Sequence, residues 1–239
     1  MREPLRVLDL FSGVGGFSLG LERAGMTTVA FCEIEEYPRR VLAKHWPHVP
    51  IHRDVRELNG ADVGAVDVVC GGFPCQDISY AGLGAGLDGE RSGLWREQAR
   101  VIGEVRPSFV IVENPAAIRG RGLDEILGHL AAIGFDAVWD DIPASFVGAP
   151  HARIRTWIVA YAERGERWAQ SYRGALGRMG REQQSVPWDR DWQSALRELR
   201  GMDDGSAYRV DRVDTIRNSV VPQIPEIIGR AILAAEANA

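Results

Sequence analysis

The sequence contains a single lysine, Lys44, so arginine supplies 27 of its 28 basic residues. We attribute this imbalance to genomic base composition rather than to phosphate contacts, although arginine is the better bidentate donor. The 33 acidic residues outnumber the basic ones, and the net charge of −5 does not by itself indicate nucleic-acid binding. The stretch 164–181 departs from this balance with five arginines and one acid, Glu166, and is a candidate phosphate-facing surface.

Cysteine and long apolar runs are scarce as well. Cys32, Cys70 and Cys75 are odd in number, widely spaced and without the pairing of metal ligands, which predicts a reducing compartment and no metal site. No apolar run approaches ~20 residues, and the start lacks the apolar segment of a signal peptide. We therefore expect a cytoplasmic protein without a membrane span.

What the chain does contain is an alternation of strand-like and helix-like segments. Its 239 residues, 45% of them hydrophobic, suffice for one substantial core or a large domain with a small appendage. The alternation predicts an α/β fold with a mostly parallel sheet covered on both faces, closed by an antiparallel hairpin. The expected strands are 5–11, 28–34, 66–70, 109–112, 137–142 and 155–160, and the expected helices 16–24, 36–46, 92–105, 123–133 and 225–237.

The amino-acid composition and the hydrophobic period change at Tyr161. Residues 161–210 are rich in arginine, glutamine, glycine and tryptophan and show no sustained period, which indicates a small separate module or a long functional insertion. Residues 1–160 and 211–239 then form the main domain.

Three features at successive strand ends indicate a nucleoside ligand. A glycine turn, 12–16, follows the first strand and lets a ligand approach the backbone, although such a turn is often only a tight connection. Glu33 ends the second strand, where an acid can bind ribose hydroxyls, and Asp54 follows the short run 51–53, where an acid can accept from an adenine amino group. Ser18 stands where the dinucleotide fingerprint requires glycine, which argues against a hydride-transfer cofactor.

The turn 71–76, Gly-Gly-Phe-Pro-Cys-Gln, follows the third buried strand. A cysteine just beyond a strand end presents its sulfur outward, and partly exposed thiols are the reactive ones. Cys75 is therefore a candidate nucleophile, whereas Cys32 and Cys70 lie within strands and are expected in the core.

Five motifs in order carry a resemblance to a known family: Asp9-Leu-Phe-Ser-Gly-x-Gly-Gly16, Gly72-Phe-Pro-Cys-Gln76, Glu113-Asn-Pro115, Arg153-x-Arg155 and Asn218-Ser-Val-Val-Pro222. With them the chain resembles DNA (cytosine-5)-methyltransferases of the compact bacterial and phage type. The resemblance implies a Rossmann-like S-adenosylmethionine-dependent methyltransferase fold. It makes 1–160 plus 211–239 the catalytic and cofactor-binding domain and 161–210 a reduced target-recognition region.

The resemblance also implies roles for individual residues. Cys75 would attack carbon 6 of a flipped-out cytosine, Glu113 would hydrogen-bond the ring, and Arg155 with Arg153 would hold the base carbonyl. The implied contacts with S-adenosylmethionine are Phe11, Ser12, Gly13, Gly15, Glu33, Ile34, Asp54, Val55, Pro74, Leu94, Asn218 and Ser219. The implied contacts with double-stranded DNA are Gln76, Ser79, Asn114, Arg164 and Arg167.

The resemblance leaves partners and function partly open. It implies a monomer acting on DNA and allows for a cognate restriction endonuclease. One alternative is a tRNA cytosine-5 methyltransferase, which shares the chemistry, although Gln76 and the Arg153/Arg155 pair fit the DNA branch better. A second is a degenerate protein that binds cofactor or DNA without turnover. That alternative is motivated by the short recognition region and by Arg217, which stands where the family usually has glycine.

Overall fold

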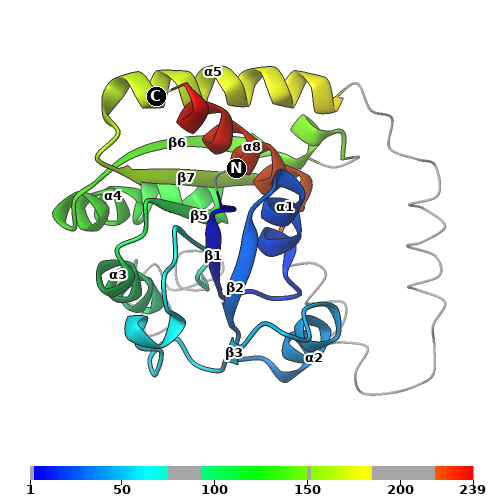
Figure 1. The fold of residues 1–239 in the computed structure, drawn as a ribbon. Helices are drawn as coiled ribbons and strands as arrows, with labels where there is room; N and C mark the ends of the chain where they lie inside the picture. The colour runs from blue at the N-terminus through cyan, green and yellow to red at the C-terminus, as the bar shows by residue number, and fades with distance from the viewer. Residues whose placement is uncertain (1–2, 75–92, 150–151, 185–218, 239) are drawn as a thin grey trace, which may run out of the picture.

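A seven-stranded sheet organises the computed structural model, which describes residues 3–74, 93–149, 152–184 and 219–238 (Figure 1). The strands are β1 (Arg6–Leu10), β2 (Thr27–Cys32), β3 (Ile51–His52), β4 (Val68–Gly71), β5 (Phe109–Pro115), β6 (Phe135–Pro143) and β7 (Ile154–Ala162). Their order is β3-β2-β1-β4-β5-β7-β6. The first five strands pair in parallel, and β7 runs antiparallel to both β5 and β6. The predicted parallel sheet with an antiparallel closing hairpin is confirmed.

Helices cover both faces of this sheet (Figure 1). They are α1 (Gly16–Ala24), α2 (Glu36–His45), α3 (Leu94–Val105), α4 (Leu123–Ala132), α5 (Gly165–Gln184) and α8 (Gln223–Ala237), with short 3-10 helices at Gly60–Val63, Ala116–Gly120 and Ala144–Val147. The predicted helices at α1, α2, α3, α4 and α8 agree with these bounds to within a few residues. None of the helices in the described ranges is long and apolar enough to cross a membrane.

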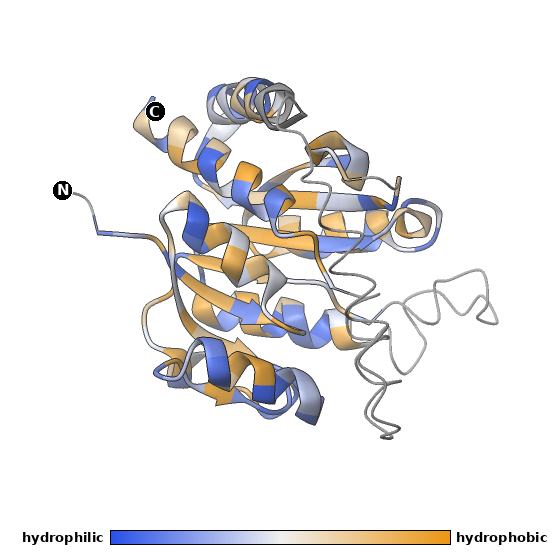
Figure 2. Ribbon diagram, turned by 90° about the vertical axis from the view of Figure 1, so that its right-hand side faces the viewer, coloured by the Kyte–Doolittle hydropathy of each residue, from blue (hydrophilic) through white to orange (hydrophobic). Residues whose placement is uncertain are grey.

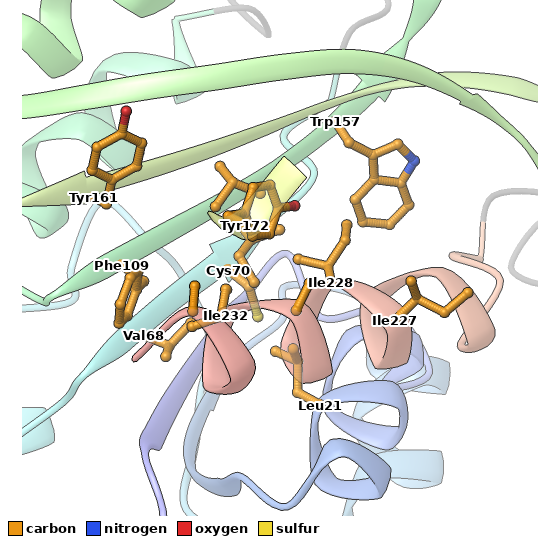
Figure 3. Close-up of a cluster of buried hydrophobic side chains, with 14 of the residues drawn as sticks. Leu21, Val68, Cys70, Phe109, Trp157, Tyr161, Tyr172, Ile227, Ile228 and Ile232 are labelled. Atoms are coloured by element: carbon orange, nitrogen blue, oxygen red, sulfur yellow. The ribbon is translucent and has the colours of Figure 1, made fainter. Parts of the chain in front are cut away.

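Two apolar clusters fill the layers on either side of the sheet. One cluster lies between the sheet and α1, α5 and α8, and its centre is drawn in Figure 3. The other lies between the sheet and α3 and α4. The strands are dominated by apolar residues while the helices carry both kinds, as Figure 2 shows. Strand residues alternate between the clusters, Val7 facing the first and Leu8 the second, as the period of two in a strand requires.

One face of helix α5 packs into the first cluster. Trp168 and Tyr172 are buried with their rings stacked 5.4 Å apart, and Trp168 also contacts Tyr161 of β7 and Phe109 of β5. The part of α5 from Trp168 to Met179 therefore shares the core of the sheet domain, although the sequence assigns residues 161–210 to a separate region. The part of the predicted target-recognition region beyond Gln184 lies outside the described residues.

Candidate active site

The carboxyl ends of β1 to β5 meet at one edge of the sheet, and most of the predicted site residues lie along this edge. In a parallel α/β sheet this is the edge at which ligands bind. β7 runs the other way, so its amino end, with Arg155, lies beside the carboxyl end of β5 in the pair Pro115–Arg155. Sequence positions more than 100 residues apart are thereby brought to one edge.

The turn after β1 is tied to the end of β2 by Glu33. The Gly13 N–H donates to Oε2 of Glu33 at 2.7 Å, and the Glu35 N–H donates to Oε1 at 2.7 Å. Glu33 is buried, and burial raises its pKa against the lowering effect of these two bonds. Phe11 adopts a left-handed conformation with φ 52, which is uncommon for a residue other than glycine. The main chain of the turn is thus fixed in place by a carboxylate that keeps free lone pairs.

The neighbouring strand ends supply an apolar surface and a second acid. Ile34 directly follows Glu33 and is 58% exposed, which is unusual for a large aliphatic side chain and suits contact with a flat ring. Asp54 follows β3, and Nε of Arg56 donates to its carboxylate at 2.9 Å, which lowers the pKa of Asp54. Val55 beside it is buried.

The segment before α8 reaches the same edge. The carbonyl oxygen of Val220 lies so close to α1 that a Cβ on Gly16 would stand 2.7 Å from it. This contact places Ser219, the residue before Val220, beside the turn after β1. Asn218 lies outside the described residues.

An ion pair between β5 and β7 forms the second half of the site. Nε of Arg155 lies 3.0 Å from Oε1 of Glu113, and the two side chains are 24% and 11% exposed. Burial raises the pKa of Glu113, while Arg155 and Arg153 oppose that rise. Burial and the charge of Arg155 lower the pKa of Arg153. A buried carboxyl of this kind can hold a proton at higher pH than an exposed one.

The turn after β4 lies directly against this ion pair. A Cβ on Gly72 would stand 3.0 Å from the carbonyl oxygen of Glu113 and 3.0 Å from its Oε2, so the turn approaches this closely because residue 72 is glycine. Phe73 is buried and its ring lies 5.5 Å from that of Trp95 on α3. Leu94 and Pro74 flank the same region. Cys75, Gln76 and Ser79 come next in the chain and lie outside the described residues.

Two of the predicted DNA contacts lie away from this edge. Nε of Arg164 is 2.8 Å from Oε1 of Glu236, and its guanidinium lies over the ring of Phe109 at 5.3 Å, at the opposite end of β5 from Glu113. Arg167 is exposed near the start of α5, at that same end. Asn114 is at the site edge but is 2% exposed and alternates with Glu113, so it faces the α3 and α4 layer. The structure therefore does not bring Arg164 or Arg167 to Glu113.

Sequence reasoning missed a buried carboxyl beneath the site. Asp9 on β1 is fully buried, its Oδ2 accepts from the Ser18 hydroxyl at 2.7 Å, and its Oδ1 has no hydrogen-bond partner among the described residues. Burial raises the pKa of Asp9 from 3.8 to about 7. An acid inside the apolar run Val7 to Leu10 was the available signal, since buried acids in strands need a specific partner.

This carboxyl predicts a pH-dependent stability. Between its unfolded pKa of 3.8 and its folded pKa of about 7 the folded protein binds the extra proton, so stability falls as pH rises through that window, by roughly 4 kcal/mol in all. Asp9→Asn keeps the shape without ionising. We expect the free energy of unfolding of Asp9→Asn, measured in urea, to rise relative to that of wild type as the pH increases from about 4 to about 8. The difference between the two should grow by up to roughly 4 kcal/mol. The exposed control Asp136→Asn should show no such trend, and a flat difference for Asp9→Asn would contradict the assignment.

No group of three or more histidine, cysteine, aspartate or glutamate residues that could hold a metal ion occurs in the part of the chain that the structure describes.

Comparison with known proteins points to one family. The family model for C-5 cytosine-specific DNA methylase matches residues 5–191. The chain is 35% identical to the type II methyltransferase M2.BsuMI of Bacillus subtilis and 33% identical to M.CviJI of Paramecium bursaria Chlorella virus IL3A. Each alignment covers 65% of this chain and 42% of the relative, so the chain spans less than half the length of these proteins.

Two solved structures share the fold. One, described as a DNA modification methyltransferase encoded within an E. coli prophage, has 27% identity and a TM-score of 0.57 over 66% of this chain and 47% of the other. Spodoptera frugiperda DNMT2 has a TM-score of 0.56 over 98% of both chains at 13% identity, a likeness of fold alone.

Proposed function

The chain belongs to the C-5 cytosine-specific DNA methylase family, and we propose that it transfers a methyl group from S-adenosylmethionine to carbon 5 of a flipped-out cytosine in double-stranded DNA. The observation that carries this proposal is the ion pair of the buried Glu113 with the partly exposed Arg155, against the Gly72-Phe73-Pro74 turn that leads to Cys75. A carboxyl of raised pKa, a guanidinium and a candidate thiol nucleophile are the groups that the reaction needs.

Cys75 is the proposed nucleophile. Carbon 5 of cytosine is too electron-poor to accept a methyl group, and attack of a thiolate on carbon 6 turns the ring into an enamine whose carbon 5 is nucleophilic. After carbon 5 has been methylated, its proton leaves to a base, the electron pair re-forms the double bond, and the carbon–sulfur bond breaks. The nucleophile is thus regenerated as a thiolate.

Glu113 and the arginines stabilise the charge that this attack develops. We assign the Glu113 carboxyl to ring nitrogen 3 and the exocyclic amine, because burial raises its pKa and lets it share a proton with a ring that is becoming negative. Arg155, held at 3.0 Å by Glu113, and Arg153 beside it are assigned to the base carbonyl. A fixed guanidinium serves this role better than a flexible ammonium group.

The other strand ends suit S-adenosylmethionine, which supplies the electrophilic methyl group when bound. Glu33 keeps lone pairs for ribose hydroxyls while it holds the Gly13 turn, and the exposed Ile34 offers an apolar surface for adenine. Asp54 is assigned to the adenine amino group. Phe11, Ser12, Gly13, Gly15, Val55, Pro74, Leu94, Asn218 and Ser219 complete the proposed cofactor contacts.

Glu33 gives a test of this cofactor site. Glu33→Gln replaces a charged acceptor of two hydroxyls by a weaker one, and we expect the dissociation constant for S-adenosylmethionine to rise about tenfold or more. The dissociation constant for DNA should change little. Titration calorimetry measures the first and a filter-binding assay the second, with the exposed neighbour variant Glu35→Gln as control. Equal losses of cofactor and DNA binding would contradict the ribose assignment.

The substrate is tested by incubation with S-adenosylmethionine labelled in its methyl group. We expect label in 5-methylcytosine of duplex DNA. Label in tRNA alone would replace the proposal by the tRNA alternative, and measurable cofactor binding without label in either nucleic acid would support the degenerate protein. We further propose that the protein acts as a monomer in the cytoplasm of a bacterial or phage-infected cell and that Gln76 and Ser79 contact the DNA. We also propose a cognate restriction endonuclease as its partner.

A further inference from the structure

One buried polar side chain near the site has no role in the chemistry above. Gln98 on α3 is fully buried, and neither its Nε2 nor its Oε1 has a hydrogen-bond partner in the described part of the chain. An unpaired buried amide is costly, and such groups in folded proteins call for a specific explanation. Its neighbours on the helix have other roles: Arg96 is exposed, and the half-buried Arg100 donates to the carbonyls of Val55 and Leu58.

The position of this amide connects it to the turn that precedes Cys75. A Cβ on Gly71 would stand 3.2 Å from Nε2 of Gln98, so the amide packs against the last residue of β4. One helical turn earlier, Trp95 packs against Phe73 of the same turn. The buried face of α3 therefore supports the turn 71–74 at two points, one apolar and one polar.

The turn contains main-chain groups that such an amide can serve. The pairing of β4 with β1 and with β5 ends at Gly71, so the main chain of Phe73 and Pro74 lies beyond both ladders. An amide offers both a donor and an acceptor, so it can bind either an N–H or a carbonyl.

We propose that Gln98 is a positioning residue: its amide hydrogen-bonds to the main chain of the turn 71–74, directly or through one buried water, when cytosine is bound. It thereby fixes the turn against Glu113 and orients Cys75 for attack. This inference rests on the proposed function, because it concerns the same reaction. The residue touches no reacting atom and acts only through the turn.

Gln98→Met tests this inference, because methionine keeps the length and volume of the side chain and removes the amide. We expect covalent attachment to DNA containing 5-fluorocytosine, at saturating S-adenosylmethionine, to slow about tenfold or more, since small misplacements of a reacting group cost this much. The dissociation constant for the cofactor should stay within about twofold, because the cofactor contact proposed for α3 is Leu94 and not Gln98. The melting temperature should be unchanged or higher, because an unpaired buried amide is lost.

Thr28→Val is the matched control. Thr28 is also buried with an unpartnered Oγ1, but it lies near the amino end of β2, away from the turn. Loss of this hydroxyl should leave covalent attachment to the DNA at the wild-type rate. Attachment by Gln98→Met at the wild-type rate would overturn the inference, while absence of attachment in wild type would instead overturn the proposed function.

Gln98→Glu supplies a second measurement that does not depend on the methionine variant folding. A buried carboxyl has a raised pKa, and its neutral form offers an O–H donor and a carbonyl acceptor much as the amide does. The ratio of its attachment rate to that of wild type should rise as pH falls. A ratio that does not change with pH would contradict a hydrogen-bonding role.

Discussion

Replacing Cys75 with alanine is expected to reduce methyl transfer to background, a loss on the order of 10⁴-fold or more, as removal of a covalent nucleophile does in other enzymes. Without a thiolate at carbon 6, carbon 5 of the cytosine stays electron-poor and cannot accept a methyl group. S-adenosylmethionine should still bind with its wild-type dissociation constant, because Glu33, Ile34 and Asp54 are unaffected. Single-turnover methylation and titration calorimetry measure the two quantities.

Cys70→Ala is the control for this substitution. Cys70 lies on β4, five residues before Cys75, and is fully buried, and burial together with Asp9 raises the pKa of its thiol well above the usual range. It therefore stays protonated and cannot take the place of the nucleophile. Methylation that survives in Cys75→Ala, or that is lost equally in Cys70→Ala, would contradict the assignment of Cys75.

Glu113→Gln is expected to lower single-turnover methyl transfer by about 10²–10³-fold, the usual loss when one preorganised group facing developing charge is removed. The amide can still hydrogen-bond the ring, but it cannot share a proton with nitrogen 3, and it leaves Arg155 without its anion. Cofactor affinity should change little.

The same variant should alter the pH profile. Because burial raises the pKa of Glu113, the carboxyl keeps its proton to higher pH than an exposed one, and the wild-type rate should fall as pH rises through that pKa. Glu113→Gln should lack this alkaline limb. Asp140→Asn, at the same level of the sheet but on the exposed edge strand, controls for the change in charge. An unchanged alkaline limb in Glu113→Gln would mean that another group titrates.

The sheet and the strand-end acids could be predicted because local patterns decide them. The apolar runs before Glu33 and Glu113, and the short run 51–53 before Asp54, place each acid at the carboxyl edge once the strands are parallel. The position of Arg155 at this same edge follows from the antiparallel closing strand, whose amino end lies beside the carboxyl end of β5.

Helix α5 could not be predicted from its residues. Glycine at 174, 177 and 180 and a surplus of arginine weaken its helical pattern, and glycine costs about 1 kcal/mol relative to alanine in a helix. The helix forms because one of its faces packs in the first apolar cluster, between the sheet and α1 and α8. The residues on this face are Trp168, Ala169, Tyr172 and Ala175. Here tertiary burial outweighs local propensity.

Asp9 and Gln98 escaped prediction for a related reason. Whether a polar residue in an apolar strand or helix is buried, and whether it finds a partner, depends on which elements pack against it. Nothing in the residues around Gln98 indicates that its amide lies against Gly71, because that contact joins α3 to the end of β4.

The most direct test of the proposed mechanism is covalent trapping. Wild-type protein incubated with S-adenosylmethionine and duplex DNA containing 5-fluorocytosine should form a complex that survives denaturing electrophoresis, because fluorine at carbon 5 prevents the elimination that frees the cysteine. Peptide mapping should place the attached base on Cys75. If the protein binds both cofactor and DNA but forms no such complex, or forms it through another residue, the account of this edge of the sheet as a cytosine-5 methylation site is contradicted.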